Sequence, residues 1–309
     1  MRFDPIGGDG GGAGRKEALS LPIGEFEIAR LAREFVLDCV NLVAGAIQAD
    51  HVSTLLFMAT LHANIRHITH DPDLAERLGG GAPPDSERRP VSLYSLARTY
   101  HLSYETARRH LHKLVDQGLI ERAQDQGLIV PTRALLGPEV AHVVTRNELR
   151  TRRFFHQLNG AAGEGVLLPL STGTMRRQIS RLTTEYFLTF LRISNEAVSH
   201  DLVTTLVFLA LLQAITEQHP VMGGTQLVPT TSVFAAARQL SLPYETTRRH
   251  VAKLIAAGLC AKAEDGKIRL SPDIKDHPAS GDYLGATIVE TCRLAANLTR
   301  SGMDLELRA

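Results

Sequence analysis

The chain has 309 residues, of which 44% are hydrophobic and 22% are charged, a composition typical of a globular protein with room for two ordinary domains. Its formal net charge of +1 does not by itself indicate binding to nucleic acid. If the protein binds nucleic acid, its basic residues must cluster on one surface. The three cysteines lie far apart and show neither a disulfide framework nor a metal-ligand spacing, which favours a reducing, cytoplasmic interior.

The first segment, residues 1–22, is rich in glycine and has no apolar core of the kind found in secretory signals. We expect it to be a disordered tail. The most apolar run, residues 202–215, is shorter than the roughly 20 residues that cross a bilayer, so we expect a buried helix and no membrane span.

The apolar periodicity and the turn residues predict two similar halves and some additional helices. In the first half we expect helices at 25–47, 50–68 and 93–99, a turn at 100–102, a helix from Ser103 to Gly118, and strands at 119–123 and 128–131. In the second half we expect helices at 175–198, 201–218 and 233–239, a turn at 240–242, a helix from Pro243 to Gly258, and a hairpin around Asp265 and Gly266. The remaining segments are a helix at 138–157, a linker at 159–165 and a terminal helix near 283–299.

The two halves are an internal repeat. Residues 91–125 match residues 231–265 at 16 of 35 positions, and residues 28–63 match residues 179–214 at 14 of 36 positions. The offsets are 140 and 151 residues, so the first half carries an 11-residue longer connection, which we place in the Gly- and Pro-rich segment 71–90.

Helix, turn, helix and hairpin in that order form a winged helix-turn-helix. We therefore predict a mainly α fold with tandem duplicated winged helix-turn-helix modules, each preceded by two helices and each ending in a small β-hairpin wing. The expected segments are the tail 1–22, a first half 23–136, a helix and linker 137–170, a second half 171–275, and a C-terminal helix 276–309.

The second helix of each module repeats the phrase Tyr-Glu-Thr-x-Arg-Arg-His on the face opposite its apolar residues. This phrase resembles the recognition helix of bacterial winged helix-turn-helix transcription regulators of the GntR, MarR and Crp groups. The resemblance covers about 40 residues of each half. It implies that the second helix enters the major groove and that its N-terminal residues meet base edges. The implied DNA-reading residues are Tyr104, Glu105, Thr106, Arg108 and Arg109, and in the twin Tyr244, Glu245, Thr246, Arg248 and Arg249.

The chemistry of these residues suits DNA. An arginine fork can bond guanine O6 and N7 together, a glutamate can accept from cytosine N4, and hydroxyls can reach phosphate. Further phosphate contacts are expected at the end of each recognition helix and on each wing, from Lys113, Lys253, Arg122 and Lys262. For His110 and His250 we leave two roles open, packing or a phosphate contact.

The alternative interpretation is an ordinary solvated helix face, and comparison of the two copies argues against it. Core positions have drifted, from Ala107 to Thr247 and from Leu111 to Val251, whereas the exposed phrase is unchanged. Surface residues normally vary more freely than core residues, so a ligand common to both copies explains the pattern better.

We therefore expect a bacterial, nucleoid-associated transcription regulator that binds double-stranded DNA and reads paired half-sites with two recognition helices in one chain. The alternatives are a plasmid-type replication initiator with tandem winged helices and a winged-helix chromosome-organisation adaptor that grips protein. We expect the apolar helices 50–68 and 201–218 to be the place where the two halves pack on each other or on a second copy of the chain, which is a candidate partner. No cofactor and no catalytic residue is expected, because no P-loop, GxSxG, HExxH or GxGxxG phrase occurs in a suitable context.

The sequence offers three weaker candidate sites. His67 and His70 have a spacing that suits a metal with Asp71 or Asp73, but they lack a cysteine partner, and no metal site is expected. Phe57, Met58 and Phe208 are candidates for an effector pocket, although apolar residues at helical spacing usually form core. The basic clusters Arg146, Arg150, Arg152 and Arg153, and then Arg176, Arg177 and Arg181, fit either phosphate contacts or a solvated face.

Overall fold

The computed structural model describes residues 23–78, 81–123, 127–160, 171–218, 229–274 and 277–305. Helices make up 72% of these residues and the strands are few and short, so the prediction of a mainly α fold is confirmed. The expected tail 1–22 and most of the expected linker 159–165 lie outside the described residues.

Each half begins with two helices that meet nearly at a right angle, 93° for the first pair and 97° for the second. The helices are α1 (Glu25–Ile47) with α2 (His51–His70), and α7 (Gly173–Val198) with α8 (Leu202–Gln218). Asp50 caps α2 by accepting a hydrogen bond from the amide of Ser53 at 3.0 Å, and Asp201 caps α8 by accepting from the amides of Val203 at 3.1 Å and Thr204 at 3.4 Å. No single helix within the described ranges is long and apolar enough to span a membrane, and only these two bent pairs reach that length and composition together.

A compact module of two helices and a hairpin follows each pair. The first module contains α4 (Leu93–Thr99), α5 (Tyr104–Asp116), β1 (Glu121–Arg122) and β2 (Leu128–Ile129); the second contains α9 (Val233–Leu240), α10 (Tyr244–Ala256), β3 (Cys260–Lys262) and β4 (Ile268–Leu270). Both hairpins are antiparallel, and the strands of the first are shorter than the sequence predicts. In the first half α3 (Pro72–Leu78) and the 3₁₀ turn η1 (Asp85–Glu87) occupy the longer connection that the two offsets imply, and η2 (Thr132–Leu135) follows β2.

A third long helix completes each half, α6 (Pro138–Leu158) and α11 (Pro278–Arg300), and α11 begins five residues earlier than Tyr283, where the sequence predicts it. The sequences of α6 and α11 do not align, yet α6 packs on α1 as α11 packs on α7. The structural repeat therefore extends beyond the part that sequence comparison detects.

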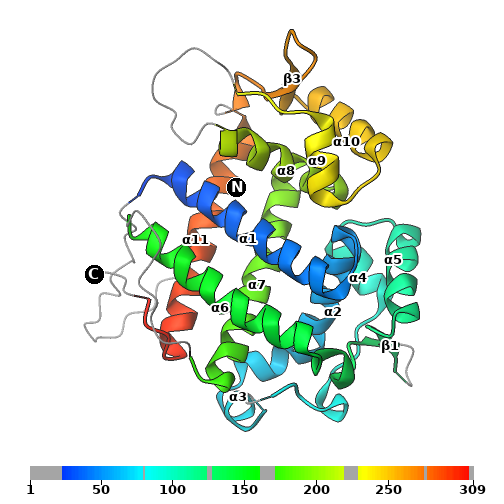
Figure 1. Ribbon diagram of the computed structural model, residues 1–309, viewed down its shortest axis with the longest axis vertical. Coiled ribbons are helices and arrows are strands. Elements are labelled where there is room, and N and C mark those ends of the chain that lie inside the picture. Colours follow the sequence, from blue (N-terminus) through cyan, green and yellow to red (C-terminus); the bar gives the residue numbers. More distant parts are fainter. Residues whose placement is uncertain are drawn as a thin grey trace, which may run out of the picture.

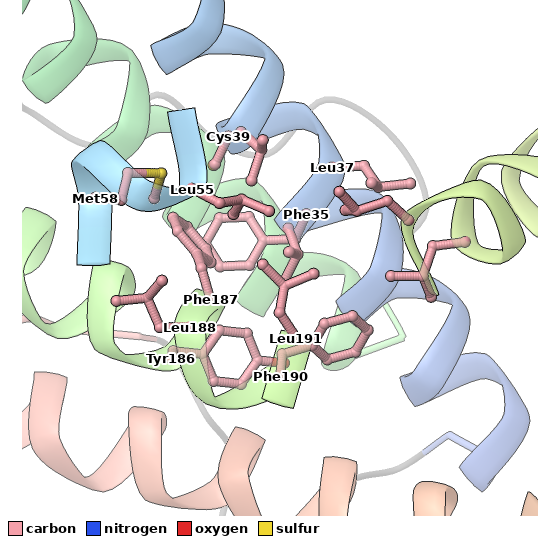
Figure 2. Close-up of a cluster of buried hydrophobic side chains, with 14 of the residues drawn as sticks. Phe35, Leu37, Cys39, Leu55, Met58, Tyr186, Phe187, Leu188, Phe190 and Leu191 are labelled. Atoms are coloured by element: carbon pink, nitrogen blue, oxygen red, sulfur yellow. The ribbon is translucent and has the colours of Figure 1, made fainter. Parts of the chain in front are cut away.

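The core lies between the halves and is continuous through both of them. Phe35 of α1 stacks on Phe154 of α6 with ring centroids 4.5 Å apart, and its edge meets Phe187 of α7 at 5.1 Å. Figure 2 shows Phe35 beside Phe187 and Tyr186, with Leu55 and Met58 of α2 above them. Because side chains from both halves fill the same interior, burial of apolar surface stabilises the two halves together.

The halves meet through α1, α6, α7 and α11, and through α2 against α7. This differs from the expectation that the two apolar helices, α2 and α8, would pack on each other. Each of them is instead enclosed within its surroundings, α2 by α1, α5 and α7, and α8 by α7, α9 and α10. The apolar surfaces of α2 and α8 are thus covered by other helices of the same chain.

The two modules sit on one side of this helical body. Figure 1 shows α5 and α10 along the right-hand side, with α6 and α11 lying away from them. Each module rests on the apolar helix of its own half, α5 on α2 and α10 on α8.

Candidate nucleic-acid interface

Local sequence signals set the bounds of both second helices. Ser103 caps α5 by accepting from the amide of Thr106 at 3.1 Å, whereas Pro243 begins α10 without a side-chain cap. Both helices end before a glycine in the left-handed conformation, Gly118 at φ +69° and Gly258 at φ +74°. These starts and ends confirm the bounds predicted from the sequence.

The hairpin of each module forms a β-bridge with a residue just before the first helix of that module. Val91 pairs with Leu128 next to α4, and Thr231 pairs with Ile268 next to α9. Asp265 and Gly266 form the predicted turn between β3 and β4, with Gly266 at φ +77°. The tip between β1 and β2, residues 124–126, lies outside the described residues. Leu102 and Leu242, in the turn before each second helix, pack against the core while remaining partly exposed.

The repeated phrase lies on the outer face of each second helix. Tyr104 is 56% exposed and Tyr244 is 52% exposed, and the glutamates and arginines next to them are also exposed. Thr106 and Thr246 are half-buried at the edge of this face. The outer faces of α5 and α10 therefore present the same side chains to solvent.

A glutamate and an arginine pair on each outer face in the same way. Nε of Arg108 donates to Glu105 at 2.9 Å and Nη2 donates at 2.8 Å; Arg248 donates to Glu245 at 2.8 and 2.6 Å. The hydrogen bond from the arginine lowers the pKa of each glutamate and raises the pKa of each arginine. This fork–fork contact fixes the planes of both guanidinium groups.

Arg109 and Arg249, the second arginine of each phrase, are exposed and form no ion pair within the described ranges. Each outer face thus holds one arginine oriented by a carboxylate and one whose guanidinium is open to an external acceptor. The hairpin residues Arg122 and Lys262 are also exposed.

His110 and His250 point inward, which decides between the two roles left open by the sequence. Nδ1 of His110 lies 2.8 Å from Oγ of Ser53, and that hydroxyl donates to Asp50 at 2.9 Å. The second half repeats the contact, with Nδ1 of His250 2.7 Å from Oγ1 of Thr204.

The single hydroxyl proton is committed to aspartate in both halves, since Thr204 donates to Asp201 at 2.8 Å. In this arrangement each histidine carries its proton on Nδ1 and donates to the hydroxyl, and Nδ1 of His110 also lies 3.2 Å from Oδ1 of Asp50. We call the set Asp50, Ser53 and His110, and its twin Asp201, Thr204 and His250, the clamp. The clamp fixes the second helix of each module to the N-terminus of the apolar helix beneath it.

The lysine at the end of each second helix lies close to the aspartate of the clamp. Nζ of Lys253 lies 2.7 Å from Asp201 and Nζ of Lys113 lies 3.8 Å from Asp50, although both side chains are more than half exposed. Each lysine therefore shares its charge with a capping aspartate, which reduces the positive charge that it offers to a phosphate.

The structure adds an aromatic pair that the sequence prediction omits. Tyr94 on α4 is 65% exposed and Phe234 on α9 is 64% exposed, and the two positions correspond at the 140-residue offset. Comparison of the two repeats could have found this pair, because an aromatic residue occurs at the same position in both first helices. Each module thus exposes one aromatic residue on its first helix and one tyrosine on its second.

Of the seven arginines in the basic clusters on either side of the linker, three are engaged within the protein, whereas Arg146 and Arg153 are exposed. Glu148 is fully buried and accepts from Arg152 at 3.0 Å and from Arg176 at 3.2 Å, while Arg181 is itself buried. Burial lowers the pKa of Arg181 to about 10. Neither role considered for these three arginines, a phosphate contact or a solvated face, fits their placement.

The remaining candidates are placed as follows. His70 pairs with Glu185 of α7 at 3.0 Å, and no group of three potential metal ligands occurs among the described residues. Phe57, Met58 and Phe208 are buried in the core, and Phe208 also lines a cavity between α8 and α1.

Comparison with known proteins gives no family assignment. No family model matches the chain, and no match was found among curated proteins or among solved structures.

Proposed function

We propose that this protein is a sequence-specific DNA-binding transcription regulator whose two modules are tandem winged helix-turn-helix units. The observation that carries the proposal is the repeated outer face of α5 and α10. The same tyrosine, glutamate and two arginines are exposed in both copies, a threonine is half-buried beside them in both, and the glutamate orients the first arginine in both.

The pairing of Glu105 with Arg108 suits base reading. A guanidinium held in a fixed plane presents its donors to guanine with less loss of side-chain freedom than a mobile one. Arg109 supplies a second fork, and Arg122 on the wing supplies a charge for the sugar-phosphate backbone. The clamp keeps each helix in a constant orientation on the body, which a base-reading helix requires.

Two such faces in one chain replace the dimer that most regulators of this kind form. Half-sites read by a pair of helices lie about one helical turn, roughly 34 Å, apart. Because the faces carry the same residues, the two half-sites should be similar in sequence.

The packing of α2 and α8 within the chain bears on whether a second copy of the chain is a partner. The structure commits both apolar helices to intramolecular packing, so they offer little surface for a second copy of the chain. A replication initiator would use the same faces on repeats at an origin, and a protein-gripping adaptor would use them on a protein surface.

Base-resolution mapping of the protein on the genome of its native cell separates these functions. The regulator predicts paired, similar half-sites inside promoters. Occupancy confined to one origin would favour the initiator, and absence of any occupied site would favour the adaptor.

A further inference from the structure

Two histidines from different halves of the chain lie against each other. His101 lies in the turn between α4 and α5, and His200 lies at the corner between α7 and α8. Their ring centroids are 5.3 Å apart and their ring planes differ by 57°. The pair therefore joins the turn of the first module to the corner of the helix pair that begins the second half.

The backbone fixes where both side chains start. His101 has φ +49° and His200 has φ +51°, so both residues are in the left-handed region, which histidine tolerates better than most residues. The amide of His101 donates to the carbonyl of Arg98 at 3.3 Å, and the amide of His200 donates to that of Asn195 at 2.8 Å. The contact between the rings is thus built on two hydrogen-bonded turns.

The ring nitrogens of both histidines are open to a ligand. Both side chains are exposed, and neither ring makes a hydrogen bond or an ion pair within the described ranges. Because solvent surrounds them, each ring can turn about its own axis without displacing a neighbour. The nitrogens can therefore be directed to one point between the rings.

The separation of the rings suits a shared metal ion. Zinc binds histidine nitrogen at about 2.0 to 2.1 Å with tetrahedral angles, which places the centroids of two rings on one ion about 5 Å apart. The distance between His101 and His200 agrees with this value. Imidazole nitrogen is a ligand for zinc, copper and nickel, whereas magnesium and calcium prefer oxygen.

We propose that His101 and His200 together bind one Zn²⁺ ion or a cation of similar chemistry. No third histidine, cysteine or carboxylate joins them in the part of the chain that the structure describes, so water completes the coordination. The site does not depend on the DNA-binding proposal.

The position of the pair shows what the ion would connect. Ser103, which caps α5, follows His101 by two residues, and Asp201 of the clamp follows His200 directly. A bound ion therefore links the start of α5 to the clamp of the other half. The position equivalent to His101 in the second module is Ser241, which has the same backbone conformation at φ +52° but no imidazole. One site per chain is expected.

Calorimetric titration of the untagged protein with Zn²⁺ tests the site. The chain has 13 histidines, so variants must separate this site from weaker binding elsewhere. His101→Asn and His200→Asn keep a residue that tolerates the left-handed region, and each should weaken binding of one Zn²⁺ at least about tenfold. His112→Asn with His142→Asn changes two exposed histidines on α5 and α6, and this control should leave that binding unchanged.

A shared ion also predicts how the two changes combine. The double variant of His101 and His200 should bind Zn²⁺ no more weakly than either single variant, because one missing ring already opens the site. Far-UV circular dichroism checks the fold. In the unaltered protein, NMR signals of both imidazoles should shift together with one equivalent of Zn²⁺, and this result decides if a variant does not fold. No binding of Zn²⁺, unchanged binding in the single variants, or additive losses would overturn the proposal.

Discussion

Nζ of Lys253 lies 2.7 Å from the carboxylate of Asp201, the residue that caps α8. The same carboxylate accepts a hydrogen bond from Thr204, whose hydroxyl in turn accepts one from Nδ1 of His250. Asp201 therefore joins the apolar helix of the second half to the helix that we propose reads DNA. Asp50 has this position in the first half.

This clamp should contribute measurably to stability. Replacing Asp50 or Asp201 with Ala removes a helix cap and leaves the histidine without its hydrogen-bonded chain, so we expect each change to lower the free energy of unfolding by about 1 to 2 kcal/mol. Urea denaturation measures this value. Asp282→Ala, which alters an exposed aspartate on α11, is the control, and an equal loss there would contradict the role of the clamp.

The clamp also predicts how stability changes with acid. Burial opposes ionisation of Asp50 and Asp201, but hydrogen bonds from His110 and Ser53 to the first, and from Lys253 and Thr204 to the second, hold both pKa values below their usual range. Their contribution is present above about pH 4 and is lost as pH falls toward the lowered pKa values. Asp50→Asn and Asp201→Asn should therefore flatten the acid side of the stability curve.

The shared core predicts that the two halves unfold together. Phe35→Ala removes a ring that contacts Phe154 and Phe187, so it should lower the free energy of unfolding by about 3 to 5 kcal/mol. We expect a single transition for both halves in urea followed by circular dichroism and by tyrosine fluorescence. Val289→Ala, at a position 57% exposed on α11, should have little effect. Two separate transitions would show that the halves are independent.

The paired glutamates should govern the specificity of DNA binding more than its strength. In Glu105→Gln and Glu245→Gln the first arginine of each face loses its fixed plane and the face gains positive charge. We expect tighter binding to unrelated DNA and a smaller ratio of specific to non-specific affinity. Glu290→Gln breaks a comparable pair with Arg293 on α11 and should leave the ratio unchanged. An unaltered ratio in the two face variants would exclude glutamate as a reading residue.

Phosphate contacts can be counted from the effect of salt. Each contact contributes a slope of about −0.9 in log K against log salt concentration, so Arg122→Gln and Lys262→Gln should each reduce the slope by about 1. Lys253→Gln should change it less, because Asp201 already shares the charge of this lysine. A flat response in the unaltered protein would point instead to a protein-binding adaptor.

Local chemistry made much of the fold predictable. Caps at Ser92, Ser103 and Ser232, and the left-handed glycines 118 and 258, set helix bounds through contacts within a few residues. The equivalence of α6 and α11 was not predictable, because helix packing requires an apolar stripe of suitable shape and not a repeated sequence.

The candidate site was predictable in its exposed residues and not in its contacts. The phrase around Tyr104 indicated an outer face, since the apolar residues of the helix fall on the other side. The clamp joins residues 57 positions apart in the chain, and nothing in the sequence paired Ser53 with His110. Burial of Glu148 was likewise not predictable, and its ion pairs draw Arg152 and Arg176 out of basic clusters for which the sequence indicates an exposed surface.

The central claim is that the arginines of the two repeated faces read DNA, and fluorescence anisotropy with a mapped target sequence tests it most directly. Arg108→Ala with Arg109→Ala, and separately Arg248→Ala with Arg249→Ala, should each weaken specific binding about 100-fold or more while the fold is retained. Arg293→Ala with Arg300→Ala removes the same charge from α11 and should have little effect. Unchanged affinity in both face variants would contradict the account, and a loss in only one would restrict DNA reading to that module.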